Sequence, residues 1–121
     1  MPYQFICHSG CSTCRKARLW LQEQEIPFEE REIRQQRPTA QELETWSRQA
    51  GIPLRRFFNT SGQLYRSMQL KDKLPAMDEQ QQLALLASDG MLVRRPILVA
   101  DGTVLVGFRE AEWQRALGER K

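Results

Sequence analysis

The chain has 121 residues, the length of a single domain (1–121), and 40% of them are hydrophobic. Its 18 basic and 15 acidic residues give a net charge of +3 and are interspersed, which favours a solvated surface over direct binding of nucleic acid. No apolar run approaches the roughly 18 residues of a membrane span, and no secretory signal pattern opens the chain. We therefore expect a cytoplasmic protein without a membrane partner.

The first part of the chain alternates between β and α patterns. Residues 3–7 are rich in β-forming side chains and predict a short buried strand. Residues 12–24 carry apolar side chains at helical spacing, and this helix should stop before Pro27, because the residue preceding a proline disfavours the α region. Residues 28–33 predict a second strand. A strand, a helix and a strand in close succession predict a βαβ unit with parallel strands.

The middle of the chain, about residues 35–92, has a helical texture. Two capping boxes mark the starts of helices within it. They are Thr39 with Glu42, and Asp78 with Gln81. Gly51 is placed to end the first of these helices. Residues 54–58 predict a short helical turn.

The β pattern returns toward the end of the chain. Residues 97–100 and 103–107 flank Asp101-Gly102, one of the strongest short hairpin signals. Residues 109–117 then have the spacing of an amphipathic helix. The tryptophans Trp20, Trp46 and Trp113 each fall on an apolar helix face and predict core positions.

This order of elements predicts an α/β protein with a thioredoxin-like fold. Its four-stranded mixed sheet would have the order β-α-β … β-β-α, with an inserted helical subdomain. The thioredoxin-like core would take about residues 1–34 and 93–121, and the insert about residues 35–92.

Cys11 and Cys14 form a Cys-x-x-Cys pair where the first predicted strand turns into the first helix. A helix N-terminus offers unpaired N–H groups and partial positive charge, which stabilise a thiolate, and the cation of Arg15 adds to this effect. Cys11, at the exposed end, is the predicted nucleophile. Cys14, one turn further on the same side, is the predicted resolving thiol.

Zinc binding is the main alternative for such a pair. A structural zinc ion takes four ligands, and the only other cysteine and histidine are Cys7 and His8. We therefore favour redox chemistry and expect no metal. Cys7 alternates with Tyr3 and Phe5 on one face of the first strand, so it is predicted to be a small core residue rather than a reactive thiol. His8 is predicted to lie in a loop or to form a local hydrogen bond.

A second group of candidate residues, Arg94-Arg95-Pro96, precedes the third predicted strand. Thioredoxin-like folds place a cis-proline here, beside the reactive cysteine. If Arg95-Pro96 is that bond, Arg95 reaches the mouth of the Cys11 loop, where its guanidinium can stabilise a thiolate or bind an oxyanion. The alternative is a pair of surface arginines, and we favour it for Arg94.

Three segments resemble the arsenate reductase (ArsC)/Spx family. They are residues 11–21 (CSTCRKARLWL), residues 26–28 (IPF) and residues 90–97 (GMLVRRPI). The similarity extends over about residues 3–117, and residues 57–62 (FFNTSG) are most similar to the uncharacterised ArsC-like members. The resemblance implies a thioredoxin-like fold with the helical insert in the expected place.

In the glutaredoxin-linked arsenate reductases of this family, a cysteine at the position of Cys11 attacks arsenate with the help of three arginines. Arg95 matches one of them. The second falls on Asn59, and the third falls on or near Phe108, with Arg109 next to it. Those reductases also typically lack a second cysteine three residues on. A multiply charged oxyanion would therefore meet fewer fixed cations in this chain.

The Spx-like regulators do carry a Cys-x-x-Cys pair, which they use as a disulfide switch. They bind the carboxy-terminal domain of the RNA polymerase α subunit, and Gly51 falls near the glycine that they use for this contact. The resemblance therefore implies a redox-sensing regulator as the second of two functions.

The other function that the resemblance implies, and the one that we favour, is a thiol–disulfide oxidoreductase or arsenate-reductase-like enzyme. Cys11, Cys14 and Arg95 would act in catalysis, and Arg15, Asn59 and Pro96 would stabilise the substrate or the thiolate. No bound cofactor is expected. Glutathione with glutaredoxin, or thioredoxin, would restore the dithiol.

Overall fold

The computed structural model describes residues 3–100 and 102–117. The chain divides into two compact units. The sheet unit takes the residues up to Glu32 together with those from Arg95 onward, and the helical unit is Ile33–Arg94. Each unit is described by itself below. Within the described residues, no helix is long and apolar enough to cross a membrane.

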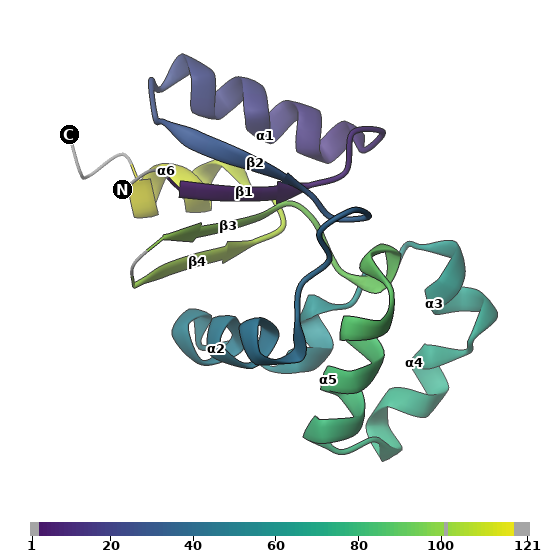
Figure 1. The fold of residues 1–121 in the computed structure, drawn as a ribbon. Coiled ribbons are helices and arrows are strands. Elements are labelled where there is room, and N and C mark those ends of the chain that lie inside the picture. Colours follow the sequence, from purple (N-terminus) through teal and green to yellow (C-terminus); the bar gives the residue numbers. More distant parts are fainter. Residues whose placement is uncertain (1–2, 101, 118–121) are drawn as a thin grey trace. The chain divides into compact units, whose positions relative to one another are not determined.

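The sheet unit is built on the predicted mixed sheet (Figure 1). Its strands are β1 (Tyr3–Cys7), β2 (Phe28–Glu32), β3 (Ile97–Ala100) and β4 (Thr103–Val106), in the order β2-β1-β3-β4. β1 and β2 are parallel, because the helix α1 (Ser12–Glu23) carries the chain back between them. β3 pairs antiparallel with both β1 and β4. The expected order of elements along the chain, the parallel β1–β2 pair and the β3–β4 hairpin are confirmed.

One core lies between the sheet and two helices, α1 and α6 (Glu110–Leu117). The sheet contributes Tyr3, Phe5, Cys7, Leu98 and Leu105, and the helices contribute Cys14, Ala17, Trp20, Leu21, Trp113 and Leu117. Because these strand residues all point to one face, α1 and α6 cover the same side of the sheet. Trp113 is fully buried, and its Nε1–H donates to the Gly107 carbonyl at 3.0 Å.

Positive φ angles shape two of the connections in the sheet unit. Gly102, in the hairpin between β3 and β4, has φ 75°, as the hairpin signal predicts, while its neighbour Asp101 lies outside the described residues. Glu25 follows α1 with φ 57°, a conformation that favours glycine. There the N–H of Ile26 donates to the Leu21 carbonyl at 3.0 Å and closes the end of the helix.

The helical unit contains four α-helices and three 3₁₀ turns in the part of the chain that the structure describes. They are α2 (Ala40–Ala50), η1 (Leu54–Phe57), α3 (Gln63–Ser67), α4 (Leu70–Lys73), η2 (Leu74–Ala76), α5 (Glu79–Ser88) and η3 (Gly90–Leu92). Both capping boxes are confirmed, with reciprocal hydrogen bonds of 2.8–3.1 Å between cap and third residue. Gly51 ends α2 in the left-handed conformation, φ 70°, as predicted. The short helices α3 and α4 were not expected from the sequence.

The end of the helical unit lies against two of its earlier segments, one around Phe58 and one at Ile33. A β-bridge joins Phe58 to Val93, and the Arg94 N–H donates to the Phe57 carbonyl at 2.7 Å. Gly90 packs against the backbone of Ile33, whose carbonyl oxygen lies 2.4 Å from the position that a Cβ would take. This glycine is therefore needed for close approach of the two segments.

Candidate functional site

Cys11 lies in the sheet unit at the N-cap of α1. A tight turn positions it, in which the Cys11 N–H donates to the His8 carbonyl at 3.0 Å. Its backbone is extended (φ −91°, ψ 121°), its side chain is half-buried, and the first turn of α1 contains no acidic residue. The sulfur therefore meets the positive end of the helix dipole without a competing carboxylate from that turn.

The surroundings of Cys11 lower the pKa of its thiol. Burial opposes ionisation and is the largest single effect. It is outweighed by the backbone N–H and the thiol of Cys14, the charge of Arg95 and the backbone N–H of Thr13, all of which stabilise the thiolate. Cys11 is thus suited to nucleophilic attack.

Cys14 is fully buried, and the pKa of its thiol is strongly raised. The interaction with the Cys7 thiol is the largest cause, and burial adds to it. The His8 N–H, 3.5 Å from the Cys14 sulfur, acts in the opposite direction. Cys14 therefore holds a proton while Cys11 is ionised, which divides the pair into a nucleophile and a reserve thiol.

The Arg95-Pro96 peptide bond is cis, as its position before the third strand of a thioredoxin-like fold led us to expect. Pro96 is buried, and its carbonyl accepts a hydrogen bond of 2.7 Å from the Gly107 N–H, which fixes the start of β3. Arg95 is half-buried, and its charge lowers the pKa of Cys11. The structure thus brings Arg95 and Cys11 into one site.

The remaining residues predicted from the sequence have other surroundings. Arg15 is exposed, and its backbone N–H donates to the Cys11 carbonyl at 3.1 Å. Asn59 and Gly51 belong to the helical unit. Asn59 is half-buried there, and its N–H donates to the Leu92 carbonyl at 2.7 Å. Gly51 is exposed, with open space where a Cβ would lie.

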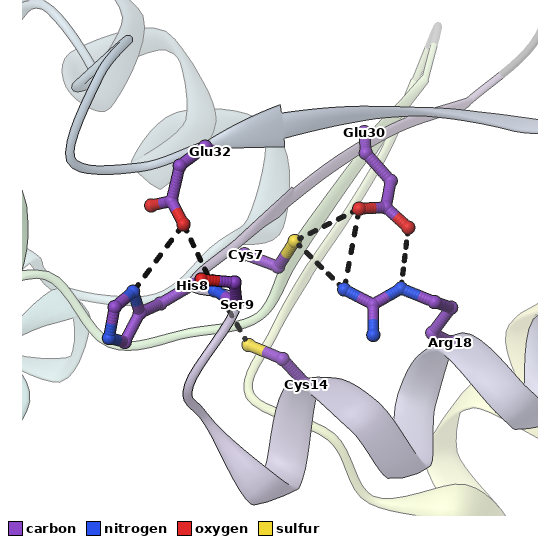
Figure 2. A network of polar contacts seen from close by, with 7 residues as sticks. All are labelled: Cys7, His8, Ser9, Cys14, Arg18, Glu30 and Glu32. Atoms are coloured by element: carbon purple, nitrogen blue, oxygen red, sulfur yellow. Dashed lines mark hydrogen bonds and ion pairs between the residues drawn. The ribbon is translucent and has the colours of Figure 1, made fainter.

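A polar network that the sequence did not predict surrounds Cys7 (Figure 2). The Arg18 Nη2 lies 3.6 Å from the Cys7 sulfur, and a Glu30 oxygen lies 3.9 Å from it. Arg18 and Glu30 also form an ion pair with each other. The core position of Cys7 is confirmed, since it is 3% exposed, but it has charged partners. Cys14 and Arg18 are four residues apart and therefore lie on the same face of α1. This spacing is the signal by which part of the network could have been found.

Glu32 holds the loop before Cys11 from the neighbouring strand. One of its oxygens accepts a hydrogen bond of 3.0 Å from the Ser9 N–H and lies 3.5 Å from His8 Nδ1 (Figure 2). His8 lies in the loop after β1, as predicted, and its Nδ1 faces Glu32 without a hydrogen bond. In residues 3–100 and 102–117, no group of three or more histidine, cysteine, aspartate or glutamate side chains is placed to hold a metal ion.

A mixed β-α-β … β-β-α sheet, a Cys-x-x-Cys pair at the start of α1 and a cis-proline before β3 define the thioredoxin-like class of proteins. Comparison with known proteins narrows the class. The model of the ArsC family matches residues 7–116, and the chain belongs to this family.

Several relatives span nearly the whole chain. The uncharacterised protein YusI of Bacillus subtilis is 44% identical over 114 residues, which cover 94% of this chain and 97% of YusI. The global transcriptional regulator Spx of Enterococcus faecalis is 35% identical over 109 residues, 89% of this chain and 80% of the regulator.

Solved structures agree with this assignment. An ArsC-family-related protein from Bacteroides fragilis is 45% identical, with a TM-score of 0.92 and coverage of 95% of this chain and 97% of that one. A protein described as a possible arsenate reductase from Streptococcus mutans is 38% identical, with a TM-score of 0.86 and coverage of 95% and 98%. The family thus includes relatives named as regulators and as reductases.

Proposed function

We propose that this protein is a cytoplasmic thiol–disulfide oxidoreductase that uses Cys11 as nucleophile and Cys14 as resolving thiol. The observation that carries the proposal is the placement of the pair at the start of α1, with Cys11 half-buried at the N-cap and Cys14 fully buried one turn further on. These surroundings lower the pKa of Cys11 and raise that of Cys14. Paired titratable groups whose environments push their pKa values apart are typical of sites that assign different chemical roles to the two groups.

The proposed reaction has two exchange steps. The Cys11 thiolate attacks one sulfur of a disulfide substrate, forms a mixed disulfide, and releases the other sulfur as a thiolate. Loss of the Cys11 negative charge removes one of the effects that raise the pKa of Cys14. Cys14 then loses its proton and attacks the Cys11 sulfur, which releases the second substrate thiolate and leaves a Cys11–Cys14 disulfide. Two electrons from glutathione with glutaredoxin, or from thioredoxin, restore the dithiol.

Arsenate is the more specific substrate to consider, since a relative with 38% identity is described as a possible arsenate reductase. Arg95 is suited to binding such an anion beside Cys11. The neutral amide of Asn59 stands where the resemblance places a second arginine. We therefore expect disulfide substrates to react faster than arsenate.

Turnover assays test the proposal directly. The full chain is assayed with hydroxyethyl disulfide and with arsenate, first with glutathione and glutaredoxin and then with thioredoxin. Cys11→Ser should abolish turnover with every donor. Cys14→Ser should retain only the glutathione-dependent route, because glutathione can resolve the mixed disulfide in place of Cys14. No turnover with any pair of substrate and donor, or unchanged turnover in Cys11→Ser, would refute the proposal.

A second candidate, a redox-sensing transcriptional regulator, is favoured by the 35% identity to Spx. Gly51, exposed at the end of α2, would then contact the carboxy-terminal domain of the RNA polymerase α subunit. A pull-down with that domain, with the protein reduced and oxidised, separates the two candidates. Binding that Gly51→Arg abolishes supports the regulator, and no binding in either state excludes it.

A further inference from the structure

Cys7 occupies an unusual position for a residue of a buried strand. It ends β1, is 3% exposed, and shares its sheet face with Tyr3 and Phe5 in the core beneath α1. A cysteine that served only as a small apolar side chain would have apolar neighbours on all sides. Two charged side chains from different elements instead meet the Cys7 sulfur, Arg18 from α1 and Glu30 from β2 (Figure 2).

The two charged groups can do complementary work on this thiol. The Arg18 guanidinium, 3.6 Å from the sulfur, stabilises a thiolate, and its ion pair with Glu30 keeps it in place and raises its own pKa. The Glu30 carboxylate, 3.9 Å from the sulfur, is placed to accept the thiol proton. In the reduced protein the pKa of Cys7 is lowered, chiefly by the Cys14 thiol and also by Arg18, against burial and the Glu30 charge. When Cys14 is in a disulfide its S–H is gone, and Arg18 and Glu30 remain beside the Cys7 sulfur to ionise it.

Cys14 is in contact with both other thiols. Its side chain interacts with that of Cys7 and with that of Cys11. Cys7 and Cys14 belong to one buried core cluster, and Cys11 packs against its edge. The buried sulfur of Cys14 therefore has a thiol beside it on two sides, that of Cys11 at the edge of the core and that of Cys7 within it.

We propose that Cys7 is a third redox thiol, which attacks the Cys14 sulfur of an oxidised Cys11–Cys14 pair and moves the disulfide into the core. The inference rests on the proposed function, which supplies that disulfide. Where Cys7 is protonated, its proton first passes to Glu30. The Cys7 thiolate then forms the Cys7–Cys14 bond as the Cys11–Cys14 bond breaks. The electron pair leaves on Cys11 as a thiolate. No external oxidant or reductant is consumed, because one disulfide replaces another.

The site itself sets the direction of this exchange. A thiol of low pKa is the better leaving group in thiol–disulfide exchange. Cys11, stabilised by the helix N-terminus and Arg95, is such a leaving group, whereas the buried Cys14 is a poor one. Attack by Cys7 should therefore expel Cys11 rather than Cys14. The exchange leaves Cys11 reduced at the mouth of the site, ready for a second substrate, while the first oxidation is stored beneath α1.

A differential-labelling experiment on the full chain tests the exchange. The reduced protein is oxidised with one equivalent of diamide, quenched in acid, unfolded, and labelled with N-ethylmaleimide. It is then reduced, and the remaining cysteines receive iodoacetamide. All three cysteines lie in one tryptic peptide, residues 1–15, so that its fragment ions read out which cysteine carried the first label. The proposal expects N-ethylmaleimide on Cys11 in most of the oxidised molecules.

The alternative outcomes separate this inference from the proposed function. If N-ethylmaleimide is found only on Cys7, the protein forms a Cys11–Cys14 disulfide alone, which overturns the exchange and leaves the proposed function standing. If N-ethylmaleimide is found on all three cysteines, no disulfide forms, which overturns both. Cys11→Ser should still form a Cys7–Cys14 disulfide with diamide, whereas Cys7→Ala should be limited to Cys11–Cys14. Arg18→Met should slow the appearance of label on Cys11, and Arg18→Lys should restore it.

Discussion

Replacement of Arg95 by methionine should raise the pKa of Cys11, because the Arg95 charge is one of the groups that stabilise the thiolate. An opposite charge close by shifts a pKa by about 1–3 units. Burial and the interactions with Cys14 each affect the Cys11 thiol more than Arg95 does. We therefore take the lower end of this general range, at which the thiolate fraction below the pKa falls about tenfold. The intrinsic nucleophilicity of a thiolate rises with its pKa and recovers about threefold of that loss, so alkylation should slow by about three- to fourfold.

The measurement is the rate of iodoacetamide alkylation at Cys11 between pH 4 and 10, followed by mass spectrometry of the tryptic peptide. In the reduced wild-type protein the midpoint should lie below that of an ordinary thiol, and in Arg95→Met it should move to higher pH. Arg94→Met is the matched control, because it removes the same charge at the neighbouring position and Arg94 is not among the groups that shift the pKa of Cys11. An unmoved midpoint in Arg95→Met, or an equal shift in Arg94→Met, would refute the role given to Arg95.

Three further predictions concern stability and protection. In the native reduced protein at pH 7, iodoacetamide should label Cys11 and leave the buried, protonated Cys14 unlabelled until urea unfolds the chain; equal rates would contradict the assigned roles. Gly90→Ala should lower the free energy of unfolding by about 1–3 kcal/mol, since its Cβ would collide with the Ile33 carbonyl, and an unchanged urea midpoint would count against this packing. Glu25→Gly should raise the free energy of unfolding by about 0.5–1 kcal/mol, because the φ of 57° at this position favours glycine. A lower urea midpoint in this variant would show that the Glu25 backbone is not strained.

Local signals explain why much of the fold could be predicted. The capping boxes at Thr39 and Asp78 act through side chains within three residues, so the sequence alone identifies the two helix starts. The hairpin before Thr103 is encoded just as locally. The helix α3 was missed because Gly62 precedes it without a side-chain cap, and five residues are too few to establish a period.

The candidate site likewise has one part that the sequence predicts and one part that it does not. Cys11 and Cys14 could be recognised because their chemistry depends on a spacing of three residues at a helix start. The contact of Cys7 with Glu30 could not be recognised, because it depends on the register of β1 against β2, which pairs Phe5 with Glu30 and Cys7 with Glu32. Register is a tertiary property, and the alternation of apolar residues in β1 gives no indication of a charged neighbour on the next strand.

The distribution of the tryptophans makes the two units separately observable by fluorescence. Trp20 and Trp113 belong to the sheet unit, where their rings pack edge to face with centroids 6.2 Å apart, and Trp46 is the only tryptophan of the helical unit. Each of the three is nearly or fully buried, so that unfolding of its surroundings moves it into water and shifts its emission to longer wavelength. A chain that keeps only Trp46 reports on the helical unit, and a chain that lacks only Trp46 reports on the core around Cys14. The unfolding of the two units can then be followed as two distinct optical signals.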